Sequence, residues 1–232
     1  MGINMGLVDL FYTASTWVFP VLFAVTLHEA AHGYVAWRLG DDTAYRQGRV
    51  TFNPLKHVDP FGTILLPALL LFMRAPFLFG WAKPVPVAFE RLRHPRRDMV
   101  IVAVAGPGTN FLLATVSAAL FHALWLLPEA VQQWSAQMLY NSILLNLVLA
   151  VFNMLPLPPL DGGRVAVGLL PRKLARPLAG VEPYGMLILI GVIFVLPMVG
   201  DRLGIDLDVF HLAVWTPVTW LLDIFTWLAG IG

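Results

Sequence analysis

The 232-residue sequence contains no cysteine and few charged residues. Without cysteine the chain can form no disulfide bond and offers no thiolate ligand to a metal ion. Charged residues make up 12% of the chain, about half the share of roughly 25% found in soluble domains. The formal net charge is only +1, and the basic residues are scattered over loops, so nothing indicates a nucleic-acid partner. Because 58% of the residues are hydrophobic, we expect an integral membrane protein without a large soluble domain.

Apolar segments dominate the chain, and spans are expected at 7–39, 100–127, 130–160 and 185–198. The last apolar segment, 209–231, is counted as a fifth, although Pro217 and its tryptophans also suggest an interfacial helix. A further apolar segment, 61–80, is interrupted by Pro67, Arg74 and Pro76, which favours a re-entrant piece. Residues 48–52 have the character of a short strand. The fold class predicted is therefore an all-α polytopic membrane protein, with about five transmembrane helices, a re-entrant segment and a short membrane-dipping β-hairpin. We expect one domain, 1–232, with a core at about 7–165 and C-terminal helices at about 184–232.

The distribution of basic residues predicts the orientation of the chain. If 61–80 enters and leaves the membrane on the same side, thirteen of the fifteen Lys and Arg residues fall on one face. The positive-inside rule makes that face cytoplasmic. If 61–80 crosses the membrane instead, the two basic loops that flank it lie on opposite faces, and this alternative stays open. We expect the inner membrane of a bacterial or archaeal cell, with His32 and Asp161 toward the cytoplasmic ends of their helices.

The sequence His28-Glu29-Ala30-Ala31-His32 is an H-E-x-x-H motif within an apolar helix. Residues four apart lie on one helix face, so both imidazoles can reach a single metal ion. Glu29 stands beside the first histidine, where it can take a proton from a water molecule at the metal. The alternative is a buried polar cluster without a metal, which is costly at the depth of a bilayer.

Asp161 is the best candidate for a third metal ligand. It is the only carboxylate between Glu129 and Glu182, and it follows three prolines in four residues that must break the preceding helix. Two histidines leave a catalytic zinc ion one protein ligand short. The alternative role for Asp161 is a turn residue, because Asp-Gly is common in turns. The two glycines that follow it would let the backbone approach its neighbours closely.

Together these residues resemble the site-2 protease family of intramembrane zinc metalloproteases. The resemblance rests on H-E-A-A-H-G at 28–33 in an early span and N-M-L-P-L-P-P-L-D-G at 153–162 at the end of a later one. The intervening stretches that also resemble the family are G-R-V-T at 48–51, N-P-L-K-H-V-D-P at 53–60, G-W-A-K-P-V-P-V at 80–87 and A-G-P at 105–107. The match runs from about 26 to 164, and the paired motifs are highly specific. The chain resembles a short member that lacks a PDZ domain.

The resemblance implies one Zn²⁺ per chain, held by His28, His32 and Asp161, with Glu29 as the general base. It implies hydrolysis of peptide bonds within or near the transmembrane segments of single-span membrane proteins, in regulated intramembrane proteolysis. The stretch 48–52 resembles a family β-loop that receives the unwound substrate as an added strand. This role agrees with the chemistry, since a helical peptide bond is shielded and an exposed strand edge can pair with an extended chain. A homo-oligomer or a regulatory membrane partner stays open.

Three further residues are weaker candidates for substrate binding. The amide of Asn153 could hold the substrate backbone or the developing oxyanion, or it could make a hydrogen bond between helices. Asn110 follows Gly106-Pro107, where capping or packing is the competing role. His57 lies in a polar loop near the predicted substrate edge, and the alternative is a surface histidine without a function.

Two other functions compete with proteolysis. A membrane metal-ion transporter would spread its histidines and carboxylates along a path, whereas here they converge at one depth. A non-catalytic membrane scaffold would need no base at Glu29. We therefore expect an enzyme.

Overall fold

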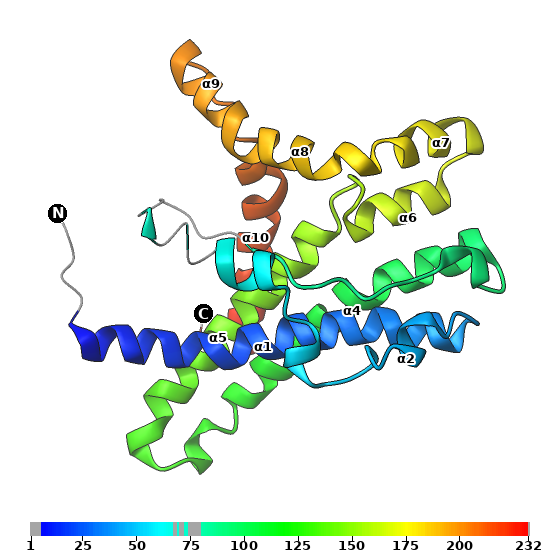
Figure 1. Ribbon diagram of the computed structural model, residues 1–232. Helices are drawn as coiled ribbons and strands as arrows, with labels where there is room; N and C mark the ends of the chain where they lie inside the picture. Colours follow the sequence, from blue (N-terminus) through cyan, green and yellow to red (C-terminus); the bar gives the residue numbers. More distant parts are fainter. Residues whose placement is uncertain (1–5, 67–68, 70–71, 74–79, 232) are drawn as a thin grey trace.

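The computed structural model describes residues 6–66, 69, 72–73 and 80–231. All regular elements in these ranges are helical, which confirms the predicted all-α class (Figure 1). The α-helices are α1 (Leu7–Arg38), α2 (Thr43–Arg46), α4 (Pro95–Phe121), α5 (Glu129–Asn153), α6 (Asp161–Leu169), α7 (Arg172–Gly180), α8 (Gly185–Ile190), α9 (Leu196–Leu203) and α10 (Thr216–Leu228).

Four helical stretches within the described residues are long and apolar enough to cross a membrane, at Phe11–Arg38, Pro95–Phe121, Glu129–Asn153 and Arg172–Leu203. The first three correspond to spans expected from the sequence. The fourth is longer than the short span expected at 185–198, because α7, α8 and α9 follow one another with only short helical turns between them. The apolar C-terminal segment forms a helical turn, His211–Trp215, that leads directly into α10.

Helices α1, α4 and α5 pack together as the centre of the molecule, and α6 packs on α4 (Figure 1). Where α10 meets α4 and α5, a cluster of buried side chains forms the main apolar core. Its members are Ala114, Ala118, Ile143, Leu147, Val214, Val218, Phe225 and Ala229. The small residues of α4 let the neighbouring helices approach closely. This packing gives the long helices fixed relative positions, which a site shared between helices requires.

The connection between α5 and α6 breaks the helix as the prolines predict. α5 ends at Asn153, and α6 begins at Asp161 after a segment of turns. Gly162 and Gly163 lie so close to the backbone of Met154 and Pro158 that a Cβ at either position would collide with it. The expected close approach at these glycines is confirmed. The chain therefore folds tightly back on itself, and Asp161 is buried rather than left on an exposed turn.

The β-hairpin predicted around 48–52 is not present in the part of the chain that the structure describes. Gly48 ends a turn, and residues Val50, Thr51 and Phe52 form bends. The strand-like pattern was misleading because a strand needs a neighbouring backbone to pair with, and no described segment supplies one. The segment is instead held by single contacts, among them a hydrogen bond from the Arg49 Nη2 to the Lys83 carbonyl at 2.8 Å.

Half of the re-entrant segment predicted at 61–80 lies outside the described residues. Its first part forms a helical turn, Pro60–Leu65. The Asp59 side chain caps this turn by accepting hydrogen bonds from the backbone N–H groups of Phe61 and Gly62. The choice between re-entry and a full crossing therefore stays a prediction.

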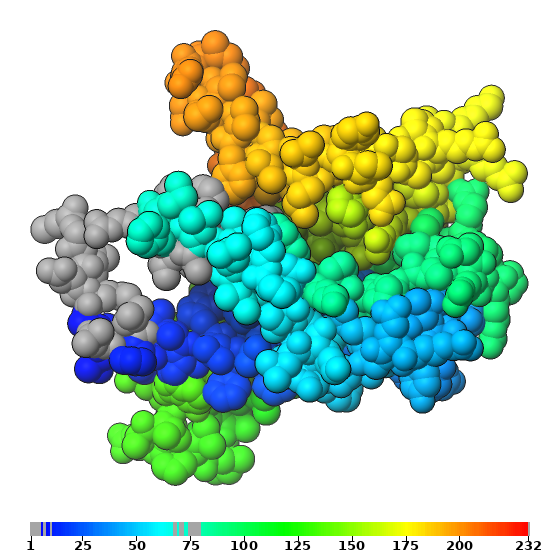
Figure 2. All heavy atoms as spheres, in the orientation of Figure 1, coloured from blue at the N-terminus to red at the C-terminus, as the bar shows by residue number. Residues whose placement is uncertain are grey.

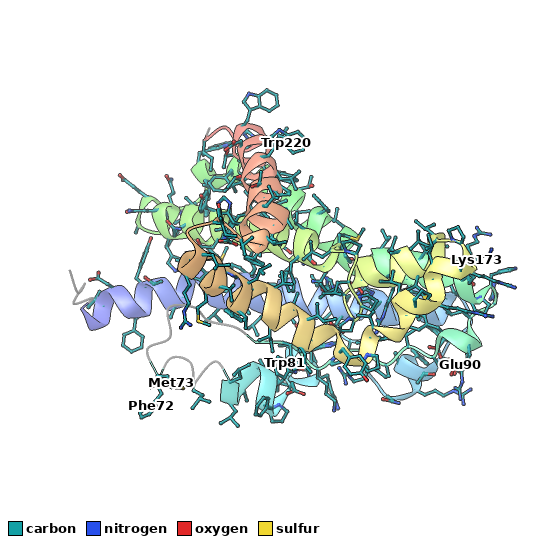
Figure 3. The ribbon with its side chains drawn as sticks, turned by 90° about the horizontal axis from the view of Figure 1, so that it is seen from above. Phe72, Met73, Trp81, Glu90, Lys173 and Trp220 are labelled. Carbon is teal, nitrogen blue, oxygen red and sulfur yellow. The ribbon has the colours of Figure 1, made fainter. Side chains whose placement is uncertain are left out.

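The basic segments gather at one end of the molecule. Figure 1 shows α2, the C-terminal end of α1 and α7 on the same side of the molecule. Figure 3 labels two residues at this end, Lys173 of α7 and Glu90 of the loop before α4. The α8–α9 stretch leads away from this end and projects from the bundle (Figure 2). Its α9 carries Arg202. The elements at the first end, α2, α7 and the C-terminal end of α1, carry Arg38, Arg46, Arg172, Lys173 and Arg176.

Candidate metal centre

His28, His32 and Asp161 meet inside the helix bundle, as the sequence predicts. The two imidazole Nε2 atoms lie 3.1 Å apart. Asp161 Oδ2 lies 3.3 Å from the Nε2 of His28 and 3.2 Å from the Nε2 of His32. All three residues are buried, and they are the group of three metal-ligating side chains found among the described residues. Two turns of α1 and the start of α6 thus supply three ligand atoms to one point.

Hydrogen bonds on the far side of each imidazole define which ring nitrogen carries the proton. His32 Nδ1 lies 2.7 Å from the carbonyl of Val102, which can only accept. His28 Nδ1 lies 2.6 Å from Asn110 Oδ1. The amide nitrogen of Asn110 is engaged with the Ala24 carbonyl and with Asn146 Oδ1, so Oδ1 is the acceptor. Both neutral imidazoles therefore hold their proton on Nδ1 and direct a lone pair from Nε2 toward the other ligands.

The third ligand carries a negative charge. Asp161 Oδ2 is buried and has no hydrogen-bond partner of its own. The two nitrogen lone pairs and the carboxylate oxygen face one another without a proton between them. A cation at this point stabilises the arrangement. The donor set fits zinc, which accepts histidine and carboxylate ligands and keeps one position open in catalytic sites.

Gly106 of α4 forms the wall behind the two imidazoles. A Cβ at this position would collide with the Nε2 atoms of both His28 and His32. Only two residues further along α4, a Cβ at Gly108 would meet nothing within 4 Å. The A-G-P stretch therefore contributes clearance for the ligands, a role that the sequence pattern did not reveal.

Glu29 lies one residue after the first ligand, on a different face of α1. Its carboxylate Oε2 accepts a hydrogen bond of 2.8 Å from the backbone N–H of Val85. Its other oxygen makes no hydrogen bond among the described residues, and the side chain is half-buried. The loop that contains Val85 therefore fixes one carboxylate oxygen of Glu29 and leaves the other available.

A chain of buried polar side chains runs from His28 into the bundle. Asn110 links His28 to Asn146, and Asn146 donates to the Ser142 carbonyl at 2.8 Å. Ser142 in turn shares a hydrogen bond with Ser117. Asn110 is fully buried, at 0% exposure, and its side chain contacts the imidazole of His28. Its position is that of a residue that orients His28.

The two remaining candidates for substrate binding occupy different environments. His57 is only 2% exposed, so the expectation of a surface histidine was wrong. Its Nε2 lies 3.1 Å from the Thr51 carbonyl, and it thereby holds the shape of the segment predicted as the substrate edge. Asn153 ends α5 and is half-buried, and its amide nitrogen donates to the Leu149 carbonyl.

A buried site of two histidines and one carboxylate, with a glutamate beside it and helices able to cross a membrane around it, is typical of a membrane-embedded metal-dependent hydrolase. Comparison with known proteins agrees with this class. The model of peptidase family M50 matches residues 127–198. YwhC of Bacillus subtilis (strain 168), assigned by name to the zinc metalloproteases, is 41% identical over 185 residues, which make up 78% of this chain and 80% of YwhC.

Two Rip2 proteins, assigned by name to the zinc metalloproteases, are also similar. Rip2 of Mycolicibacterium smegmatis (strain ATCC 700084 / mc(2)155) is 32% identical over 73% of this chain and 62% of its own length. Rip2 of Mycobacterium tuberculosis (strain ATCC 25618 / H37Rv) is 31% identical over 76% of this chain and 65% of its own length. No solved structure matches. The chain belongs to peptidase family M50, the site-2 protease family. It is an intramembrane zinc metalloprotease. No segment among the described residues forms the strands of a PDZ domain.

Proposed function

We propose that His28, His32 and Asp161 hold one zinc ion and that Glu29 is the general base of the protease. The observation that carries this assignment is the convergence of two imidazole Nε2 atoms and a buried carboxylate oxygen, all within 3.3 Å of one another. Both Nδ1 atoms already make hydrogen bonds, so the two Nε2 atoms and the carboxylate oxygen are left to bind a metal ion.

His28, His32 and Asp161 would hold the zinc ion, which would supply a Lewis acid that activates water and polarises the scissile carbonyl. Glu29 accepts the proton of the attacking water on its available oxygen and returns it to the leaving amine. Val85 N–H keeps the carboxylate in one orientation during both transfers. His28, His32 and Asp161 are buried, which strengthens the electrostatic interactions between them.

We propose that the substrate is a single-span membrane protein, unwound where it is cut. Two apolar cavities along α1 support this substrate class. One, of about 690 Å³, is lined by residues that include Trp17, Val25, His57 and Trp81 (Figure 3 labels Trp81). The other, of about 520 Å³, is lined by Leu27, Ala30, Ala31, Tyr34, Val50, Thr51, Phe52 and Thr109. They flank the segment 50–54, so an extended chain paired with this segment has apolar room on both sides.

The finer topology is part of the same proposal. We place α10 and the turn before it as a fifth crossing, in addition to the four stretches that qualify by length and composition. The end of the molecule that carries α2 and α7 faces the cytoplasm, because the basic residues gather there (Figure 1). His28 and His32 lie in the third of α1 nearest this end.

Co-expression with a panel of tagged single-span proteins tests the function. The chain is compared with its Glu29→Gln form, which removes the base but keeps a side chain of the same shape. We expect at least one panel protein to be shortened by the intact chain and to accumulate uncut with Glu29→Gln. Glu90→Gln is the matched control, because Glu90 is exposed and distant from the ligands in sequence. Equal cleavage by the intact chain and Glu29→Gln would overturn the assignment of the base.

A further inference from the structure

Arg49 is a buried cation without an acidic partner among the described residues. It is 6% exposed, and no ion pair joins it to a carboxylate in the described part of the chain. Its Nη2 donates to the carbonyl of Lys83 at 2.8 Å and lies 3.4 Å from the carbonyl of Pro84, while its Nε is buried without a hydrogen-bond partner. A buried charge of this kind is costly, so its position calls for a physical reason.

The peptide unit between Pro84 and Val85 links Arg49 to Glu29. In a trans peptide the C=O and N–H groups point in opposite directions. On one side the Pro84 carbonyl faces the Arg49 guanidinium, and on the other the Val85 N–H donates to Glu29 Oε2 at 2.8 Å. A cation beside the carbonyl oxygen polarises the peptide, which makes its N–H a stronger donor to the carboxylate. One planar group thus joins a buried positive charge to the carboxylate of Glu29.

The loop that carries this peptide is fixed at several other points. The Lys83 N–H donates to the His57 carbonyl at 2.9 Å, and the Ala88 N–H donates to the buried Asp41 carboxylate at 2.7 Å. The two prolines on either side of Val85 restrict the backbone further. These contacts hold the loop as a whole, but Arg49 is the residue whose side chain contacts the carbonyls next to the Val85 N–H.

Gly33 of α1 lets this loop reach Glu29. It follows Glu29 by four residues and therefore lies on the same helix face. A Cβ at Gly33 would lie 3.0 Å from the side chains of both Val50 and Val85, which is tighter than ordinary packing. The segments that carry Arg49 and the Pro84–Val85 peptide thus pack directly on the face of α1 that presents Glu29.

We propose that Arg49 is a positioning residue for Glu29, acting through the Pro84–Val85 peptide; this inference rests on the proposed role of Glu29 as the base. Arg49 holds the peptide so that its N–H fixes one carboxylate oxygen, which leaves the other oxygen in place for the proton. Arg49 contacts neither the metal ligands nor, in this proposal, the substrate. Its loss therefore impairs turnover while zinc stays bound.

The test compares Arg49→Gln and Arg49→Lys with the full-length chain, using dye-labelled casein as an unfolded probe that needs no unwinding. For Arg49→Gln we expect kcat to fall about 10- to 100-fold, the usual range for a residue that supports a reactive group, with KM and zinc content unchanged. Arg49→Lys should recover part of kcat, because an ammonium group keeps the charge but not the planar fork. Arg46→Gln is the matched control, since Arg46 is exposed and its side chain pairs with Asp42 in the described part of the chain.

A double-mutant cycle separates positioning from a general structural role. Glu29→Asp shortens the side chain and takes its carboxylate out of reach of the Val85 N–H. Arg49→Gln should therefore lower kcat little further in a chain that already carries Glu29→Asp. Losses that add in full would overturn the proposal, as would a kcat of Arg49→Gln equal to that of the intact chain. A fall in kcat matched by an equal fall in bound zinc would also overturn it.

The same assay separates this inference from the proposed function. If the intact chain and Glu29→Gln cleave casein equally, the assignment of Glu29 fails. If only Glu29→Gln is inactive and Arg49→Gln equals the intact chain, the inference about Arg49 alone fails. Should Arg49→Gln not fold, Arg49→Lys carries the test, and a kcat equal to that of the intact chain contradicts the proposal.

Discussion

The two chemical parts of the site are held by different kinds of structure. Helices hold the ligands: α4 supplies Asn110 and the Val102 carbonyl behind the imidazoles, and Gly106 of the same helix clears the space between them. A loop holds the proposed base, because the hydrogen bond to the Glu29 carboxylate among the described residues comes from the Val85 N–H. In the proposed mechanism, metal binding and proton transfer therefore depend on different supports, although His28 and Glu29 are neighbours in the chain.

The largest effect is expected where a helix meets the ligands. In Gly106→Ala the added methyl group would collide with the Nε2 atoms of His28 and His32. We expect zinc affinity to fall at least about 100-fold, the upper end of what a residue supporting a ligand contributes, and cleavage to fall with it. Zinc content by mass spectrometry and casein turnover measure both effects. Gly108→Ala is the control, since a Cβ there meets nothing within 4 Å; equal zinc content in the two variants would contradict the steric account.

A smaller loss of zinc is expected at the amide behind His28. Asn110→Ala removes the acceptor of the His28 Nδ1–H and frees the imidazole to change its tautomer. Zinc affinity should fall about 10- to 100-fold, as measured by competition with a chelator. Thr115→Ala on the exposed side of α4 removes a hydrogen bond within the helix and should leave affinity unchanged. An Asn110→Ala variant with full affinity and lower substrate binding would favour the original interpretation of Asn110 as a substrate-binding residue.

On the loop side, turnover should change while zinc stays bound. In Gly33→Ala the methyl group would press on Val50 and Val85, so the loop must move by a few tenths of an ångström. If the poorer alignment of Glu29 raises the activation free energy by roughly 1 kcal/mol, kcat falls about fivefold. Zinc content should equal that of the unaltered chain. Gly180→Ala in α7, where a Cβ has open space, is the comparison. Zinc loss in Gly33→Ala would show that the two parts are coupled after all.

A change in stability sharpens the same contrast. Zinc that binds only the folded chain stabilises it by about 4 kcal/mol at a thousandfold excess over Kd. Removal of zinc by a chelator should therefore lower the Tm of the intact chain and of Arg49→Gln alike. In Asp161→Ala the chelator should change nothing, because a ligand is already missing. A chelator effect on Asp161→Ala equal to that on the intact chain would contradict the ligand assignment.

The sequence predicted the helix side of the site much better than the loop side. H-E-x-x-H places two ligands by helical periodicity alone, and Asp161 stands out as a lone carboxylate in an apolar region. The Val102 carbonyl supports His32 and the Val85 N–H supports Glu29, and both are backbone groups that leave no signal in residue type. Arg49 did offer a signal, as a basic residue in the G-R-V-T stretch. Its burial depends on contacts 34 residues away.

The errors in the predicted fold have a similar origin. The strand expected at 48–52 rests on local propensity, but a strand also needs a partner that the described chain does not supply. The polar neighbours of His57 in the sequence indicated a solvated side chain. In the structure its Nε2 instead contacts the Thr51 carbonyl. Long apolar helices and the proline break were predicted well because they depend on sequence-local physics. Features that depend on which distant segments meet were not.

X-ray absorption at the zinc edge tests the central claim most directly. For the purified chain the account predicts about one zinc ion per molecule, with two imidazole groups and oxygen ligands around it. Asp161→Ala should lose most of this zinc, whereas Glu29→Gln should retain it with the same two imidazoles. A zinc environment with fewer than two imidazoles in the intact chain, or one unchanged in Asp161→Ala, would contradict the site described here.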